Sequence, residues 1–364
     1  MRKLYFVLAA FFIVLLVSVP LFSIFFGREE SEETRILKIF CAGSLVLPMN
    51  SVEEAFEAAY PNVDVQIEGH GSIQVIRHVT EIGDEVDLQM LADYELIPTM
   101  MYNELMAESN VSFSDWYIRF AGNSIVLAYT DNSRYSDEVT AENWYEILRQ
   151  SDVKFGFPDP LIDALGYRSP MIIQLAENYY QDNALFEDLV TKNFDPGFYA
   201  VELDDVTVLV VPELLNPNTE KIALRASSVQ LVPLLESGGI DYCFLYKSNA
   251  EQYGVKYVEL PFEVNLGSSE YDDVYQRVQI KFEHQRFGSV GLIRDGKTIY
   301  YGLTIPNNAP NPDLAIDMIE FVLSGEGKNV FNNLQHPIYE PSFTDNKAIL
   351  PQELAALVET EDSD

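Results

Sequence analysis

The apolar and polar positions that follow residue 34 predict a parallel β-sheet with crossover helices. Residues 36–45 are largely apolar and end in a Gly-Ser turn, which is typical of a buried strand. Residues 50–59 carry a polar cap and helical spacing, and residues 61–72 alternate like a strand before a second Gly-Ser turn. A helix-like segment (73–83) and a strand-like segment (86–98) follow. Strand, helix, strand, helix and strand in succession favour an α/β fold.

The second half of the chain repeats this alternation. Residues 120–130 (FAGNSIVLAYT) predict one long strand, and strands and helices alternate again between residues 153 and 250. Residues 255–261 (VKYVELP) and 298–310 (TIYYGLTIPNNAP) predict strands that could return to the first set, and residues 311–334 predict two late helices. Two such sets joined by crossing strands enclose a cleft, which is the usual place for a small ligand.

These segments divide the chain into three parts. Residues 1–34 are a signal or anchor helix with an acidic spacer. Residues 35–120 together with about 266–355 form a first lobe, and residues 121–265 form a second lobe. The length of 364 residues agrees with two folded domains rather than one.

The N-terminus predicts a membrane-spanning or signal helix. Residues 4–26 are apolar apart from Ser18 and Ser23, and the segment is long enough to cross a bilayer. Arg2 and Lys3 precede it and an acidic string follows it, so the positive end stays inside and the rest is exported. The segment lacks a clear small-residue cleavage site. We expect the bulk of the chain at the extracytoplasmic face of the cell membrane, anchored or secreted.

The charge of the chain excludes one class of partner. The sequence has 57 acidic and 23 basic residues and a formal net charge of −34. Nucleic acid is therefore not expected as a partner, because phosphate contacts require clustered lysines and arginines. So acidic a surface suits a salty medium, in which screening weakens its self-repulsion.

The sequence lacks the usual motifs of catalysis. Cys41 and Cys243 form neither a disulfide framework nor a metal-binding spacing, so we expect buried free thiols. The four histidines have no metal spacing, and no phosphate-binding Gly-x-x-x-x-Gly-Lys is present. No nucleophile stands beside a general base. We expect neither an enzyme nor a resident cofactor.

Two Gly-Ser turns mark the ends of successive predicted strands. Gly43 and Ser44 follow the first strand, and Gly71 and Ser72 follow the second. In open α/β sheets, ligands bind at the carboxyl ends of strands against helix N-termini. Glycine permits close approach of the backbone, and serine adds a hydroxyl donor. Each turn alone reads as a plain turn, but two at neighbouring strand ends can converge on one anion.

A lone acidic residue stands before a third helix start. In the stretch PDPLIDALGYRSP (158–170), Asp163 precedes a helix-like run. Asp163 is interpreted either as the cap of that helix or as part of a ligand-binding loop.

Six segments, in order along the chain, carry a resemblance to a known family. They are CAGSLVLP, YPNVDVQIEGHGSIQVIRHVTEIG, ADYELIP, DWYIRFAGNSIVLAYTD, DALGYRSPMIIQLAE and LESGGIDYCFLYKSNA. Together they resemble the archaeal tungstate/molybdate-binding proteins of an ATP-driven uptake system, from about residue 37 to about 340. The resemblance implies the two-lobed periplasmic-binding-protein fold of class II.

The resemblance also implies a set of ligand-binding residues. They are Gly43, Ser44, Ser72, Asp163, Ala164, Leu165, Ser228 and Tyr246. Asp163 corresponds to a carboxylate that the family brings directly to the tungsten or molybdenum atom. The family reads Asp-Pro-Cys where this chain has Asp-Ala-Leu, and it has a glutamate where this chain has Ser228. The second departure leaves the expanded metal coordination of the family open.

The implied function is capture of tungstate or molybdate and delivery to an ABC permease served by a separate ATPase. We expect a monomer that is held at the membrane by its N-terminal helix. A binding protein of the same fold for sulfate or phosphate is the alternative, because Asp163 could accept a phosphate proton. An extracellular enzyme or a sensor on the same scaffold fits less well, since the loops lack a nucleophile or a paired acid and base.

Overall fold

The computed structural model describes residues 34–283 and 293–361. By their internal contacts the residues separate into Met1–Arg35 and Ile36–Asp364, and the second unit is described here by itself. The predicted apolar helix at 4–26 lies outside the described residues. Within the described ranges, every helix is too short or too polar to cross a membrane.

Strands from the early and the late part of the chain build a seven-stranded sheet in the order β16-β15-β4-β14-β3-β1-β2. Its strands are β1 (Arg35–Ala42), β2 (Val63–His70), β3 (Leu88–Leu91), β4 (Ile118–Asn123), β14 (Ile299–Thr304), β15 (Ile338–Thr344) and β16 (Val358–Thr360). Strands β1 and β3 are parallel, as the order of segments predicts. Strand β14 is antiparallel to both β3 and β4, so the return predicted for residues 298–310 is confirmed. The return predicted for residues 255–261 is wrong, because β11 (Lys256–Glu259) pairs with β5 (Ile125–Tyr129) in another sheet.

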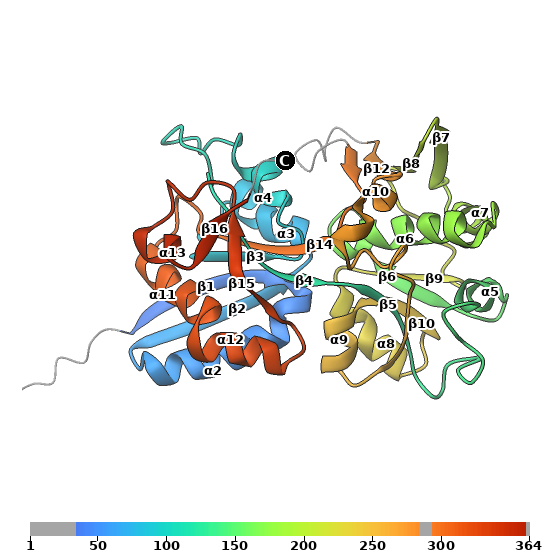
Figure 1. The fold of residues 1–364 in the computed structure, drawn as a ribbon, viewed down its shortest axis with the longest axis horizontal. Helices are drawn as coiled ribbons and strands as arrows, with labels where there is room; N and C mark the ends of the chain where they lie inside the picture. Colours follow the sequence, from blue (N-terminus) through green and yellow to red (C-terminus); the bar gives the residue numbers. More distant parts are fainter. Residues whose placement is uncertain (1–33, 284–292, 362–364) are drawn as a thin grey trace, which may run out of the picture. The chain divides into compact units, whose positions relative to one another are not determined.

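Helices accompany this sheet along the chain. They are α2 (Val46–Ala59), α3 (Ser72–Arg77), α4 (Leu96–Met101), α11 (Pro312–Leu323), α12 (Gly325–Asn333) and α13 (Gln352–Ala355). The two predicted late helices are therefore α11 and α12. Helix α2 buries Met49, Val52 and Phe56, which recur at the spacing of one helical face. That helix contacts α11 and α12 (Figure 1).

Two further sheets follow. A five-stranded sheet has the order β11-β5-β10-β6-β9, and a four-stranded sheet has the order β13-β12-β8-β7. The first contains β5 (Ile125–Tyr129), β6 (Phe155–Pro158), β9 (Ile222–Arg225), β10 (Tyr242–Tyr246) and β11 (Lys256–Glu259). The second contains β7 (Tyr199–Leu203), β8 (Val206–Val211), β12 (Val278–Phe282) and β13 (Ile293–Asp295). The lobe boundaries given above stay predictions.

The long strand predicted for residues 120–130 is wrong, because the chain breaks it at Ser124. Strand β4 ends at Asn123 in the seven-stranded sheet, and β5 begins at Ile125 in the five-stranded sheet. The side chain of Asn123 gives the physical reason. Its Oδ1 accepts hydrogen bonds from the amides of Ser124 (3.0 Å) and Ser248 (3.4 Å), so a side chain replaces the strand ladder at this point.

Helix α6 (Ala164–Tyr180) packs against both the five-stranded and the four-stranded sheet. It contacts β6 and β10 of the five-stranded sheet and β8 and β12 of the four-stranded sheet (Figure 1). Residues 164–177 are all buried, which is typical of a helix enclosed by other elements. The other helices between residues 144 and 275 are α5 (Trp144–Arg149), α7 (Leu185–Leu189), α8 (Val232–Glu236), α9 (Lys247–Gln252) and α10 (Asp272–Tyr275). The residues before α6 are thereby fixed relative to both sheets.

Candidate functional site

Ser44 lies in a buried turn after β1. The turn η1 (Gly43–Leu45) follows β1 directly, and only 2% of Ser44 is exposed. The Tyr301 hydroxyl donates to Ser44 Oγ (2.9 Å), and Asn249 Nδ2 donates to the Ser44 carbonyl (3.0 Å). Because Ser44 Oγ accepts a hydrogen bond from Tyr301, its own proton remains available for donation to a ligand.

Ser72 has the same character at the start of α3. It is fully buried, and the amide of Ala92, just after β3, donates to Ser72 Oγ (3.0 Å). An amide can only donate, so the serine oxygen is the acceptor and the serine proton is left to be donated elsewhere. Ser44 and Ser72 thus present two hydroxyl donors at the ends of β1 and β2.

Asp163 caps α6. Its Oδ1 accepts from the amides of Leu165 (2.8 Å) and Gly166 (3.3 Å), so the cap interpretation is confirmed. Oδ2 takes no part in these two bonds, and a ligand role is therefore compatible with the cap. The side chain is 5% exposed, and this burial raises the pKa of Asp163 to about 7, against the lowering effect of the two amides and Arg168.

The loop before α6 is held close to α3. The carbonyl of Ile162 accepts from the first-turn amides of Ile73 (3.2 Å) and Gln74 (3.4 Å). A Cβ on Gly71 would lie 2.3 Å from that carbonyl oxygen, a distance that no side chain tolerates. Only glycine permits this approach, so the predicted Gly-Ser turn has a steric reason to be there.

A second loop approaches Gly43. The short helix η4 (Ser228–Leu231) has Ser227 as its N-cap residue, and Ser227 and Ser228 are both buried. A Cβ on Gly43 would lie 2.9 Å from Ser227 Cβ and 3.0 Å from its Oγ. Ser227 therefore joins the predicted Ser228 beside the first turn. Ser227 was not predicted, although it directly precedes Ser228.

Arg168 is fixed in a buried network with Asp93. Its Nη1 donates to the carbonyl of Ala92 (2.7 Å) and to the hydroxyl of Tyr246 (3.0 Å), and its Nη2 lies 3.5 Å from Asp93 Oδ1. Arg294 Nη2 donates to Asp93 Oδ2 (2.5 Å). Burial alone would raise the pKa of Asp93, but the charges of Arg294 and Arg168 hold it at about 2. Arg168 thus binds the loop after β3 to α6 and β10.

Tyr246 closes the arrangement at the end of β10. It is 1% exposed and accepts from Arg168 as described, and its ring lies 5.6 Å from that of Tyr301. Burial raises the pKa of its hydroxyl well above the usual value, so the phenol keeps its proton at neutral pH. Its hydroxyl is therefore a third potential donor.

The structure brings the predicted residues together through contacts between strand ends. Ser44 is linked to Tyr246 through Tyr301, and Ser72 is linked to Tyr246 through Ala92 and Arg168. Gly43 directly precedes Ser44, and the other predicted residues follow Ile162 or Ser227 in the sequence. They are Asp163, Ala164, Leu165 and Ser228. Tyr301 was not predicted, because nothing in a strand such as TIYYGLT distinguishes a tyrosine in a site from one in a core.

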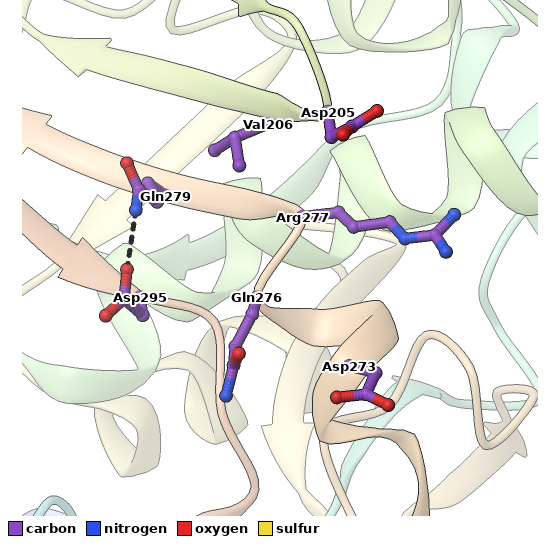
Figure 2. Close-up of a pocket in the computed structure, with 7 residues that line it drawn as sticks. All are labelled: Asp205, Val206, Asp273, Gln276, Arg277, Gln279 and Asp295. Atoms are coloured by element: carbon purple, nitrogen blue, oxygen red, sulfur yellow. Dashed lines mark hydrogen bonds between the residues drawn. The ribbon is translucent and has the colours of Figure 1, made fainter.

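A cavity apart from these strand ends measures about 680 Å³. It is lined by Asp205, Val206, Asp273, Gln276, Arg277, Gln279 and Asp295 (Figure 2). Gln279 Nε2 donates to Asp295 Oδ1 (2.7 Å) within it. Three carboxylates against one arginine repel an oxyanion, and none of the predicted site residues lines this cavity. We therefore place the candidate site at the strand ends.

The residues that the structure describes contain no cluster of metal-ligating side chains. Among residues 34–283 and 293–361, no three histidine, cysteine, aspartate or glutamate side chains are arranged to hold a metal ion. Cys41 and Cys243 are buried free thiols, as expected, and burial raises the pKa of Cys41 to about 12.

The fold and these strand-end loops define a class of ligand-binding proteins, and the sequence gives the family. Residues 37–333 match the model of the bacterial extracellular solute-binding protein family, and the chain belongs to that family. It is a solute-binding protein of the extracellular, transport-associated kind.

Archaeal relatives extend over nearly the whole chain. An uncharacterized solute-binding protein of Methanococcus maripaludis (strain C5) is 41% identical over 335 residues, which are 91% of each chain. The molybdate/tungstate-binding protein WtpA of Pyrococcus abyssi is 38% identical over 339 residues, covering 91% of this chain and 92% of the relative. WtpA of Thermococcus kodakarensis is also 38% identical, covering 92% and 90%.

Solved structures of binding proteins share the fold. The periplasmic molybdate-binding protein of Azotobacter vinelandii aligns with a TM-score of 0.53 at 12% identity, covering 87% of this chain and all of that one. The sulfate-binding protein SubI of Mycobacterium tuberculosis aligns with a TM-score of 0.52 at 13% identity, covering 85% and 88%. The mixed α/β fold is thus that of the periplasmic binding proteins.

Proposed function

We propose that this solute-binding protein captures tungstate or molybdate at the strand-end site and delivers it to an ABC permease driven by a separate ATPase. The observation that carries the proposal is the 38% identity, over nine tenths of the chain, to archaeal proteins named for binding these two oxyanions. The class II form of the fold, an N-terminal helix at the membrane, an extracytoplasmic location and a monomeric state belong to the same proposal.

The chemistry of the strand ends supports an oxyanion. Tungstate and molybdate are dianions without a proton at neutral pH, so they require donors. Ser44, Ser72 and Tyr246 provide buried hydroxyls on separate elements. Capture by lobe closure requires that the anion binds the closed state more tightly than the open one.

Asp163 determines how the metal is bound in this proposal. One carboxylate oxygen caps α6, and the other would ligate the tungsten or molybdenum atom. Its partner at the position of the family's glutamate is Ser228, which can donate a hydrogen bond but is a weaker ligand. We therefore propose a coordination by one carboxylate in place of two.

Sulfate or phosphate is the second candidate, and one observation favours it. The pKa of Asp163 is raised to about 7, so near neutral pH the side chain is present in both forms. Its carboxylate form can accept the proton of a phosphate, and its acid form can donate to a sulfate. The two candidates differ in what the removal of Asp163 does to each anion.

Isothermal titration calorimetry tests the proposal. A soluble form that begins at residue 34 is titrated in concentrated salt with tungstate, molybdate, sulfate and phosphate, and the titrations are repeated with Asp163→Ala. Asp131→Ala, a change at an exposed carboxylate, is the matched control. We expect tight tungstate and molybdate binding that Asp163→Ala weakens at least about tenfold.

The other outcomes decide against it. Tight binding of phosphate alone would make Asp163 a proton acceptor and overturn the tungstate assignment. Absence of binding for all four anions would leave Asp163 as a helix cap and remove the oxyanion function.

A further inference from the structure

We infer that Tyr301 is a specificity-determining residue, which holds the Ser44 hydroxyl as a donor so that the site selects oxyanions without a proton. The inference rests on the proposed function and concerns the same site. It is drawn from the direction of two consecutive hydrogen bonds, from Asn123 to Tyr301 and from Tyr301 to Ser44. Asn123 lies where the chain passes from β4 to β5.

The amide of Asn123 fixes the first direction. Its oxygen accepts from two backbone amides, those of Ser124 and Ser248, and a backbone amide can bond only to an acceptor. Its Nδ2 is therefore the atom that faces Ser248 Oγ (2.8 Å) and the Tyr301 hydroxyl (3.3 Å). Asn123 donates to Tyr301, and the orientation of its amide is set by its surroundings.

The Tyr301 hydroxyl accepts one hydrogen bond and donates the next. It already accepts from Asn123, and burial raises its pKa well above the usual value, so it retains its proton. Ser44 Oγ, 2.9 Å away, is the acceptor of that proton. One of the two acceptor lone pairs of Ser44 Oγ is then occupied, and the hydroxyl points its own proton away from Tyr301.

Ser72 is also held as a hydrogen-bond donor, in its case by a backbone amide. The backbone amide of Ala92 donates to its Oγ (3.0 Å), and the carbonyl of the same residue accepts from Arg168 (2.7 Å). Both serines are thus held as donors by groups on other elements. Tyr301 can be tested separately, because a side chain can be shortened by one hydroxyl and a backbone amide cannot.

Serines that are held as donors discriminate by protonation where they face the anion, whereas the free oxygen of Asp163 is an acceptor in the same proposed site. Tungstate, molybdate and sulfate present only acceptor oxygens at neutral pH, whereas phosphate keeps a P–O–H group. When a serine donor faces the P–O–H group, two protons oppose each other and a buried hydrogen bond is lost. Binding sites reject close analogues by such unmade hydrogen bonds. Without the Tyr301 hydroxyl, Ser44 can rotate and accept the phosphate proton.

The test compares Tyr301→Phe with wild type by calorimetry at pH 8, using tungstate and inorganic phosphate as probes. We expect the ratio of tungstate to phosphate affinity to fall about tenfold, because tungstate loses a positioned donor and phosphate gains an acceptor. Tyr300→Phe is the matched control on the same strand, and its ratio should stay within about twofold. Asn123→Ala, which releases Tyr301 from its donor, should shift the ratio in the same direction.

The results separate this inference from the proposed function. Wild-type binding of tungstate judges the function, and the ratio in Tyr301→Phe judges the inference. An unchanged ratio, or an equal loss of affinity for both anions, would make Tyr301 a packing residue only and overturn the inference. If Tyr301→Phe does not fold, an unchanged ratio in Asn123→Ala overturns it as well. Absence of oxyanion binding by the wild type overturns both.

Discussion

At the residue scale, the chemistry of the site depends on hydrogen bonds whose direction is fixed by their partners. Ser72 Oγ accepts from a backbone amide, and Asp163 Oδ1 accepts from two. The serine is left as a donor, and the aspartate is left with one oxygen outside the cap. Residues of ordinary type thereby acquire a defined role in recognising an anion.

Asp163 makes a prediction for the dependence of stability on pH. Its pKa is about 7 in the folded chain and near 3.8 when unfolded, so between these values the folded state keeps a proton that the unfolded state loses. This contribution to stability is complete below about pH 4 and is lost as the pH rises to about 7. Relative to Asp163→Asn, the wild type should lose up to about 1.4 kcal/mol per pH unit in this window.

Urea unfolding of the anion-free proteins from pH 4 to pH 8 measures the difference. Asparagine retains the helix cap, so Asp163→Asn isolates the effect of the charge. Asp163→Ala also loses the cap, and its unfolding free energy should be about 1 kcal/mol lower than that of Asp163→Asn at every pH. A difference between wild type and Asp163→Asn that does not change with pH would contradict the raised pKa.

At the element scale, close approach of backbones brings the loops together. The first turn of α3 donates to the Ile162 carbonyl, and η1 packs against Ser227. Both contacts require glycine, at Gly71 and Gly43, because a Cβ would overlap the opposing loop. The two Gly-Ser turns are therefore contact points between elements as well as turns.

Gly71→Ala should uncouple α3 from the loop before α6. The new Cβ would meet the Ile162 carbonyl oxygen at 2.3 Å and its carbon at 2.9 Å, and these are backbone atoms that cannot rotate away. We expect tungstate affinity to fall at least about tenfold, with a loss of about 1–3 kcal/mol in unfolding free energy from the overlap.

Gly197→Ala is the matched control for this change. A Cβ there has open space around it, so both affinity and stability should stay close to wild type. Calorimetry and urea unfolding measure the two effects. Wild-type tungstate affinity in Gly71→Ala would show that the close approach does not matter for binding.

At the scale of the whole molecule, a buried ionic network links distant parts of the chain. Asp93 follows β3 in the seven-stranded sheet, Arg168 belongs to α6, and Arg294 belongs to β13 in the four-stranded sheet. All three side chains are at most 7% exposed. In a chain of net charge −34, these two buried arginines provide local positive charge that the surface lacks.

Asp93→Asn should destabilise the folded chain by about 3–5 kcal/mol, because two arginines stay buried beside a neutral side chain. The pKa of Asp93 is about 2, below its unfolded value, so the stabilisation is present at neutral pH and is lost only as the pH falls through about 2. Urea unfolding at pH 7 measures the effect.

The control for Asp93 is an exposed ion pair. Asp131 pairs with Lys256, and their side chains are 79% and 55% exposed, so Asp131→Asn should change stability by less than about 1 kcal/mol. Equal effects of the two substitutions would contradict a structural role for the buried network.

The sequence by itself determined the α/β order, the family and most of the loops that meet at the site. Regular apolar spacing predicted β1, α2 and the two late helices, because burial of one face imposes a period on the chain. The cap at Asp163 could also be predicted, because a cap bonds only to residues two and three positions ahead in the sequence.

Only the tertiary structure decided which residues from separate elements share the site. Tyr301, Ser227 and Arg294 carry no local pattern, because their partners lie far away along the chain. The break at Ser124 escaped prediction as well, since it depends on a bond from Ser248 to the side chain of Asn123. Local periodicity records how each element buries its own face, whereas long-range hydrogen bonds fix which ends of those elements meet.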